Sequence, residues 1–178
     1  IGLTAAETGH LVMATLHTID AGQTINRIVG MFDTEEQEQV RVRLADTLRW
    51  IISQRLVPKV GGGRTALLEI MGSNLRTKES VTIGESEGKT FYEIIEASRP
   101  FGWCTFDHSC MDAYEQGLIS EETALAYCTK KSIVSRGIDN VKKQRGESGE
   151  DALSLRMKIA EEAKKAGPPP VPATLKLK

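Results

Sequence analysis

Two short, mostly apolar runs stand out from a chain whose other apolar positions recur at helical spacing. The first is residues 11–16 (LVMATL), and the second is residues 64–71 (RTALLEIM). A short apolar run is typical of a strand that is buried on both faces, as in parallel sheets. We therefore predict one buried strand at each run.

Helical patterns lie on either side of the first run. Residues 2–8 have the pattern of a helix end, and Gly9 is the residue type that most often stops a helix. Asp20, with Gln23 three positions later, makes a capping box for the next helix. The apolar face of that helix recurs at i, i+3, i+4 and i+7 and consists of Ile25, Ile28, Val29 and Phe32.

A longer helix is predicted over residues 34–57. Thr34 suits the N-cap, and the acidic side chains of Glu35 and Glu36 suit the positive end of the helix dipole. Pro58 and the glycines at 61–63 are expected to end this helix. Its apolar stripe consists of Val40, Leu44, Leu48 and Ile51 or Ile52.

The resulting order of helix, strand, helix, helix and strand is typical of a layered α/β sheet and not of a helix bundle. We assign residues 1–72 to this α/β part. Residues 73–141 show only helical spacing and predict a small all-helical subdomain, whose core is expected to contain Phe106, Met111, Tyr114, Leu118, Leu125 and Tyr127. Residues 142–178 are charged and then proline-rich, and the pattern over 142–166 fits a solitary helix and a disordered segment equally well.

Composition narrows the class of protein. The 178 residues are 40% hydrophobic and carry a formal net charge of -1, which allows one substantial core or two small ones and gives no hint of nucleic acid. The three cysteines lack a familiar zinc spacing, so no metal site is predicted and the thiols are expected to be buried or idle. No signal-like leader or membrane-length apolar run is present, which predicts a soluble protein of a reducing compartment. The start at Ile1, within a helical pattern, predicts a piece of a longer protein.

Residues 84–90 (GESEGKT) look like a phosphate-binding loop at first sight. Such a loop needs four residues between its first glycine and the Gly-Lys pair, so that successive backbone N–H groups surround a phosphate. Only three residues separate Gly84 from Gly88. We therefore expect an exposed turn before a helix and no phosphate loop at this place.

Two histidines flank the first predicted strand. His10 and His17 would stand about 23 Å apart along an extended backbone, which excludes a metal site shared by the two. His17 and Thr18 follow the strand, and ligands of open α/β sheets collect at such carboxyl ends. A neutral imidazole there can donate a hydrogen bond to a phosphate oxygen, whereas the alternative is a histidine whose ring is satisfied by backbone.

Five sequence blocks, in this order, resemble the C-terminal part of the ATPases that drive type IV pili and type II secretion. They are LTAAETGHLVMATLHT, TINRIVGMF, EQVRVRLADTLRWIISQRLVPK, GGGRTALLEIM and TFDHSCMDAYEQGLISEETALAY. The resemblance extends over residues 1–140, and the order and spacing of the blocks make it more specific than any single motif. It implies the C-terminal part of a RecA-like P-loop ATPase sheet followed by a small all-helical subdomain.

The resemblance also implies roles for individual residues. The first block corresponds to the family's His box, in which His17 faces the γ-phosphate of ATP beside Thr18. Thr4, Gly9 and His10 are the structural members of the same box. Arg27 and Arg76 become candidates for coupling or interface contacts. The family's cofactors are ATP and Mg²⁺, but its Walker A loop, acidic box and Walker B glutamate lie upstream of the matching region, so this chain alone is expected to be inactive.

Within the family, the absence of a paired C-x-x-C element after ISQRLV resembles the retraction branch. That branch implies a homo-hexameric motor for pilus retraction and twitching motility. It is cytoplasmic, peripheral at the inner-membrane face of the pilus machine against a platform protein, and has no nucleic-acid partner and no direct membrane insertion. The family's A-I-R-N-L-I-R-E element is matched only loosely after Met71, which leaves a close paralogue open. The alternative is a non-catalytic docking module of a secretion-type ATPase.

Overall fold

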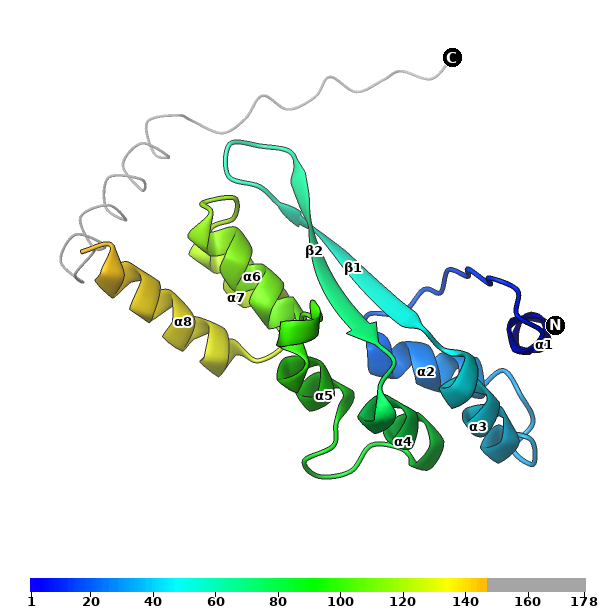
Figure 1. Ribbon diagram of the computed structural model, residues 1–178. Coiled ribbons are helices and arrows are strands. Elements are labelled where there is room, and N and C mark those ends of the chain that lie inside the picture. The colour runs from blue at the N-terminus through cyan, green and yellow to red at the C-terminus, as the bar shows by residue number, and fades with distance from the viewer. Residues whose placement is uncertain (147–178) are drawn as a thin grey trace, which may run out of the picture. The chain divides into compact units, whose positions relative to one another are not determined.

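A two-stranded antiparallel hairpin runs through the described part of the chain (Figure 1). The structure is a computed structural model that describes residues 1–146. Strand β1 (Trp50–Pro58) pairs with β2 (Arg64–Gly72) over its whole length, and glycines 61–63 turn the chain between them with positive φ. The helical elements are α1 (Gly2–Glu7), α2 (Ala21–Val29), α3 (Gln37–Thr47), α4 (Leu75–Ile83), α5 (Phe91–Ala97), the 3-10 turn η1 (Arg99–Phe101), α6 (Phe106–Glu115), α7 (Glu121–Tyr127) and α8 (Lys131–Gln144).

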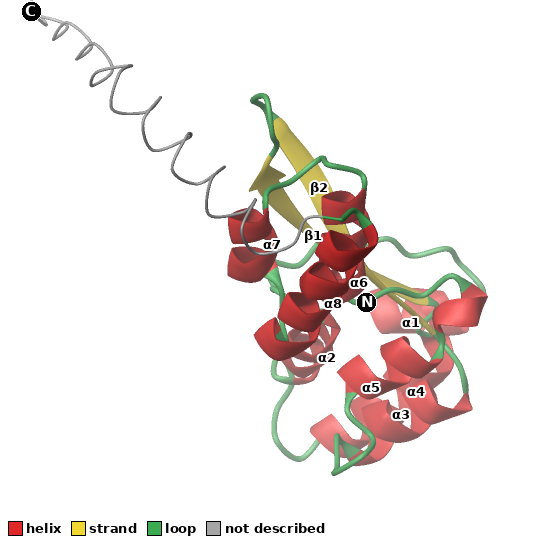
Figure 2. Ribbon diagram, turned by 90° about the vertical axis from the view of Figure 1, so that its left-hand side faces the viewer, coloured by secondary structure: helices red, strands yellow, loops and turns green. Residues whose placement is uncertain are grey.

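The hairpin has one covered face and one open face. Along β1 the covered side chains are Ile51, Ser53 and Val57, and those on the open side are Trp50, Ile52, Gln54 and Leu56. Helix α2 contacts both strands, α6 contacts β2 and α7 contacts β1. Helices α3, α4 and α5 gather at the end of the hairpin opposite its turn (Figures 1 and 2). The alternation of strand side chains therefore divides residues that face helices from residues that do not.

The main hydrophobic core lies at this end of the hairpin. It unites side chains of α2, α3, α4 and α5 with the first residues of β1 and the last of β2. The core therefore contains residues from both sides of the domain boundary predicted after residue 72, and that boundary stays a prediction. Gly72 is needed beside this core because a Cβ there would lie 2.7 Å from the indole ring of Trp103. The buried members are Ala21, Ile25, Val29, Val40, Leu44, Ala45, Ile51, Met71, Val81, Phe91, Ile94, Ile95 and Trp103.

Several predicted elements are confirmed. Asp20 caps α2 by accepting a hydrogen bond from the Gln23 N–H at 2.8 Å. The second apolar run forms a strand, β2, as predicted, but this strand is antiparallel to β1 and is covered on one face and not on both. Gly9 follows the end of α1 with φ of 89°. These are local features, so residue type and spacing were enough to predict them.

The strand predicted at residues 11–16 is wrong. Residues 10–18 form neither helix nor strand, and the side chains of Leu11 and Met13 are each 88% exposed. A strand that is buried on both faces needs neighbouring strands to satisfy its backbone. In residues 1–146, the hairpin contains both strands of the sheet, and neither pairs with this segment.

The long helix predicted over residues 34–57 is also wrong in its second half. Helix α3 begins at Gln37, with Glu36 and not Thr34 at the N-cap, and ends at Thr47. Residues 50–58 form β1 instead, because their covered and open side chains alternate with period two and pair with β2. A short apolar run fits both the helical period of 3.6 residues and the strand period of two, and tertiary pairing decides between helix and strand.

The predicted core of the helical region is confirmed in part. Phe106 is fully buried and Tyr114 is 8% exposed, but Tyr127 is 36% exposed because it lies at the end of α7. The remaining predicted core residues, Met111, Leu118 and Leu125, are half-buried. Cys110 is fully buried, as expected, and this burial raises the pKa of its thiol to about 12. The interpretation of residues 147–178 lies outside the described residues.

A buried carboxyl group joins α2 to the hairpin. Glu69 is 4% exposed, and its Oε1 accepts a hydrogen bond from the Ala21 N–H at 2.8 Å. Burial raises the pKa of Glu69 above its ordinary value, and the carboxylates of Asp20 and Asp107 add to this, whereas the Ala21 hydrogen bond and the charge of Arg55 oppose it. The protonated form of Glu69 is therefore favoured by folding.

Truncating the buried ring of Phe106 should destabilise the chain strongly. Phe106→Ala is expected to lower the free energy of unfolding by about 3–5 kcal/mol, because it leaves a cavity among buried side chains. Phe101→Ala is the matched control, since Phe101 is 75% exposed and its truncation should change stability little. Chemical denaturation of both variants measures the difference. An unchanged melting temperature for Phe106→Ala would contradict the packing of α6.

The pH dependence of stability should reveal the buried Glu69 carboxyl. At pH values between the ordinary pKa and the raised pKa of Glu69, the folded state keeps a proton on this carboxyl group that the unfolded chain has released. The contribution of Glu69 to stability therefore falls as pH rises. Glu69→Gln cannot ionise, and its melting temperature relative to wild type should rise as the pH is raised above the ordinary pKa of a glutamate.

Glu93→Gln serves as the control of opposite sign for that pH series. Hydrogen bonds from the Thr90 N–H and then its hydroxyl lower the pKa of Glu93, so its contribution is present at neutral pH and lost as pH falls. The melting temperature of Glu93→Gln relative to wild type should therefore fall as pH rises. A Glu69→Gln curve parallel to wild type at every pH would show that this carboxyl does not titrate differently on folding.

Candidate functional site

The predicted phosphate-facing residues lie on the extended segment that precedes α2. His17 is exposed, and no described residue hydrogen-bonds its ring. Thr18 is half-buried, and its Oγ1 lies 2.6 Å from Oγ1 of Thr24. Thr24 donates its hydroxyl proton to the Asp20 carbonyl at 2.8 Å, so the Thr18 hydroxyl must be the donor to Thr24. The segment thus becomes anchored at Thr18, immediately after the exposed imidazole.

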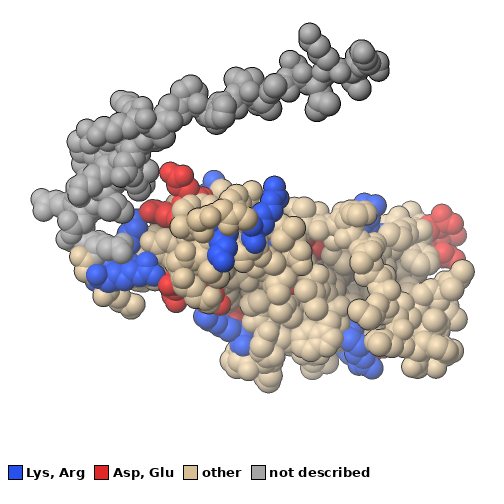
Figure 3. Space-filling model, turned by 90° about the horizontal axis from the view of Figure 1, so that it is seen from above, with Lys and Arg blue, Asp and Glu red and all other residues tan. Residues whose placement is uncertain are grey.

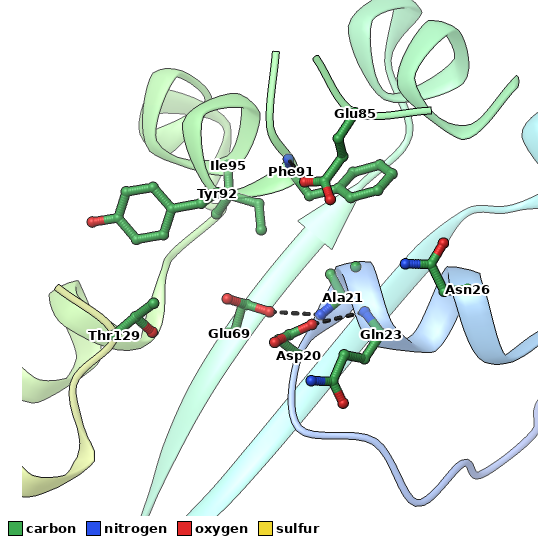
Figure 4. Close-up of a pocket in the computed structure, with 11 residues that line it drawn as sticks. Asp20, Ala21, Gln23, Asn26, Glu69, Glu85, Phe91, Tyr92, Ile95 and Thr129 are labelled. Carbon is green, nitrogen blue, oxygen red and sulfur yellow. Dashed lines mark hydrogen bonds between the residues drawn. The ribbon is translucent and has the colours of Figure 1, made fainter. Parts of the chain in front are cut away.

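The start of α2 is held by two carboxylates from different elements. Asp20 accepts from the Gln23 N–H, and Glu69 of β2 accepts from the Ala21 N–H, each at 2.8 Å. Figure 4 shows both carboxylates directed at the first turn of α2. A helix N-terminus exposes unpaired N–H groups with partial positive charge, which acidic acceptors satisfy. These two bonds fix where α2 begins and therefore where the preceding residues lie.

A hollow of about 260 Å³ lies beside this helix start. In Figure 4, α5 provides Phe91, Tyr92 and Ile95 on the side opposite Glu69. Among residues 1–146, no lysine or arginine lines the hollow, and the ionisable lining residues are Asp20, Glu69, Glu85 and Tyr92. Three carboxylates without a cation repel phosphate. The hollow therefore does not suit the phosphates of a nucleotide, and the exposed His17 is not among its lining residues.

The glycine-rich turn has a different role from a phosphate loop, as the sequence predicted. Gly84 and Gly88 have φ of 101° and 74°, and α5 begins only at Phe91, capped by Thr90. A hollow of about 400 Å³ borders this turn, but the ammonium of Lys89 pairs there with Glu79 at 2.7 Å. The lysine that a phosphate loop would direct to phosphate is thus beside a carboxylate.

The other predicted site residues are dispersed. Thr4 lies in α1 and accepts a hydrogen bond from Arg43 of α3, which also makes a two-pronged contact with Glu7. His10 is exposed, with Nδ1 3.0 Å from the Thr8 hydroxyl. Gly9 ends α1, Arg27 is exposed in the last turn of α2, and Arg76 is exposed in α4 at the edge of the larger hollow.

Residues 1–146 contain no group of three His, Cys, Asp or Glu side chains that could hold a metal ion. None of the helices described in this range is long and apolar enough to cross a membrane. On the face seen in Figure 3, basic and acidic side chains of the described residues are interspersed among uncharged ones.

Three residues that position these elements were missed by sequence reasoning. Glu69 interrupts the mostly apolar run of β2, and a carboxylate at a strand position that faces helices signals a buried partner. Arg55 lies on the covered face of β1, where alternation would have placed it once the strand was recognised. Asp107 is 3% exposed and accepts hydrogen bonds from Tyr92, Thr129 and Lys130.

Comparison with known proteins gives this arrangement its context. Residues 1–141 match the family model described as Type II/IV secretion system protein. The chain is 42% identical over 124 residues to the Type IV pilus retractation ATPase PilT of Pseudomonas aeruginosa, covering 70% of this chain and 36% of that protein. It is 39% identical over 125 residues to a twitching motility protein of Neisseria gonorrhoeae, covering 70% and 33%.

Solved structures agree with these sequences. The pilus retraction motor PilT with bound ADP matches with a TM-score of 0.63 at 37% identity, covering 76% of this chain and 37% of that one. The ATPase DotB of Legionella pneumophila matches with a TM-score of 0.57 at 30% identity, covering 68% and 32%. The described helices and hairpin thus resemble part of the α/β fold of these ATPases. The chain spans about a third of the length of the curated relatives it matches. This chain belongs to the type II/IV secretion system protein family.

Proposed function

We propose that this chain is part of a homo-hexameric, ATP-hydrolysing motor that powers type IV pilus retraction. Its relatives are pilus retraction and secretion ATPases, and one solved relative holds ADP. The motor would stand in the cytoplasm at the inner-membrane face of the pilus machine and act on its platform protein. The observation that carries the proposal is the exposed His17 ring, which stands directly before a backbone anchored at Thr18 and Ala21.

His17 supplies a hydrogen-bond donor for a phosphate oxygen of bound ATP. Its ring has no competing hydrogen bond in the described part of the chain, and the anchored residues after it reduce the ordering that a contact would cost. The Thr18 hydroxyl already donates to Thr24, so Thr18 would contribute to nucleotide binding through its backbone N–H. His10, bonded to Thr8 at the end of α1, fits the structural role expected of it, together with Thr4 and Gly9.

ATP and Mg²⁺ would need further residues beyond those present here. The 178 residues contain no G-x-x-x-x-G-K-[ST] sequence, and residues 1–146 gather no metal ligands. His17 fits the γ-phosphate end of ATP, whereas nothing described fits the magnesium ion. Arg27 and Arg76 are proposed as interface or coupling residues because both are exposed at helix termini.

A second candidate is a non-catalytic docking module of a secretion-type ATPase. The observation in its favour is the apolar character of the exposed segment before α2, where Leu11 and Met13 present most of their side-chain area. Such a surface suits association with another protein surface. Loss of ATP hydrolysis on substitution of His17 separates the motor from the docking module.

His17→Ala in the complete motor is expected to reduce turnover about a hundredfold, because one preorganised donor to the transferred phosphate is lost. The fold and the hexamer should persist, since the ring is exposed and has no described hydrogen-bond partner. Steady-state hydrolysis, melting temperature and sedimentation measure the three quantities. His10→Ala is the matched control and should act on stability and not on turnover. Wild-type turnover by a folded His17→Ala hexamer would remove the phosphate contact.

The 178-residue chain by itself is expected neither to hydrolyse ATP nor to bind it at micromolar concentrations. One charge-assisted hydrogen bond contributes on the order of 1.5–3 kcal/mol, which corresponds at best to millimolar affinity before any ordering cost. Titration calorimetry with Mg-ATP against this chain provides the measurement. A micromolar dissociation constant would show that the described residues contain a complete nucleotide site.

A further inference from the structure

One guanidinium group links two backbone segments that are far apart in the sequence. Arg55 lies on the covered face of β1, and its Nη1 donates to the Tyr127 carbonyl at 2.6 Å. Its Nη2 donates to the Ile19 carbonyl at 3.4 Å. The centre of the guanidinium lies 3.7 Å from the centroid of the Phe106 ring. Arg55 therefore contacts α6, the end of α7 and the segment before α2 at the same time.

The Tyr127 end of this link is firmly held. Tyr127 is the last residue of α7, where helix carbonyls lack intrahelical partners and attract cations. The next residues are fixed by buried Asp107, which accepts from the Lys130 N–H at 3.0 Å and from the Thr129 N–H. The Lys130 ammonium lies 3.9 Å from the centroid of the Tyr92 ring, and Tyr92 in turn donates to Asp107. The α7–α8 connection, residues 128–130, is thus tied to α5 and α6.

The Ile19 end is close to the candidate site. Ile19 stands two residues after His17, between Thr18, which bonds to Thr24, and Ala21, which bonds to Glu69. Among the described hydrogen bonds, the Ile19 carbonyl is the first backbone group after His17 that the hairpin contacts. The segment is therefore held from β1 through Arg55 and from β2 through Glu69.

The two ends of the Arg55 link differ in strength. The bond to Tyr127 is short and is supported by the Phe106 ring, whereas the bond to Ile19 is near the upper limit for a hydrogen bond. A displacement of the α7–α8 connection therefore carries the guanidinium with it and weakens the Ile19 contact first. Only arginine combines a planar face for the ring with two separate donors for two carbonyls.

We propose that Arg55 is a positioning residue that ties the His17 segment to the α7–α8 connection, so that the C-terminal helices set the position of His17. The proposal rests on the proposed function insofar as it assigns a consequence for ATP turnover. Its structural half, that a change at Arg55 is felt at residues 19–21 and 128–130 together, is independent of that function. The opposing interpretation is that Arg55 only covers Phe106.

The structural half is tested in the 178-residue chain by NMR. Arg55→Met keeps an apolar stem over Phe106 and removes both donors, and it should shift the backbone amide signals of residues 19–21 and 128–130 together. Arg55→Lys keeps the charge but not the fork, and it should shift residues 19–21 while leaving circular dichroism unchanged. Arg64→Met is the matched control, because Arg64 is exposed on the same hairpin, and it should leave both segments unchanged.

The functional half is tested in the complete motor. Arg55→Met should lower kcat about tenfold with little change in KM for ATP, because His17 is displaced and no phosphate contact is removed. The double variant His17→Ala/Arg55→Met should turn over ATP at the rate of His17→Ala alone, since Arg55 acts through His17. Arg64→Met should retain wild-type turnover.

The outcomes separate this proposal from the function on which it rests. Amide shifts confined to residues near Phe106, or additive losses of turnover in the double variant, would overturn the positioning role of Arg55. If a folded His17→Ala motor hydrolysed ATP at the wild-type rate, the proposed function would fail, and the NMR comparison would still decide whether Arg55 links the two segments. If Arg55→Met did not fold, the Arg55→Lys spectra would decide: shifted amide signals of residues 19–21 would support the link, and unchanged signals there would overturn it.

Discussion

The hydrogen bond between the Glu69 carboxyl group and the Ala21 N–H is the interaction on which the arrangement of the candidate site depends. Both groups are buried, so neither can turn to water if the other is lost, and an unsatisfied buried group costs about 1–3 kcal/mol. The bond joins the first residue of α2 to a fixed position in the β1–β2 register. It therefore sets where the helix begins and where the backbone of the preceding segment lies.

The hairpin acts as a frame because only one of its faces is covered. Ser53, Arg55 and Glu69 lie on that face among apolar neighbours, and each polar group there needs a partner or carries an energetic cost. Glu69 is bonded to α2, and Arg55 is bonded to the carbonyls of Ile19 and Tyr127. Among the buried polar side chains of residues 1–146, the Ser53 hydroxyl lacks a described hydrogen-bond partner. Polar contacts thus connect the helices on the covered face at defined points, whereas apolar burial alone would fix them less specifically.

The distribution of charge separates two surfaces near α2. The hollow beside the helix start carries carboxylates and aromatic rings, while His17 stands outside it on an exposed backbone. The carboxylates of the hollow would repel a phosphate, whereas a phosphate can approach the exposed His17 ring. This agrees with membership of a family whose relatives include ATPases, and with a chain that spans about a third of the curated relatives it matches. The described residues provide an anchored backbone beside the exposed His17 ring.

The sequence by itself determined the local features and the family. Asp20 and Gly9 act within one turn of backbone, so their types and spacings predicted where one helix begins and another ends. The order of five blocks predicted the ATPase family. Only the tertiary structure decided that residues 50–58 are a strand and residues 11–16 are not, because a short apolar run fits either period until a partner pairs with it. The same holds for Arg55, Glu69 and Asp107, whose roles depend on partners that lie at least fifteen residues away in sequence and that no local pattern could identify.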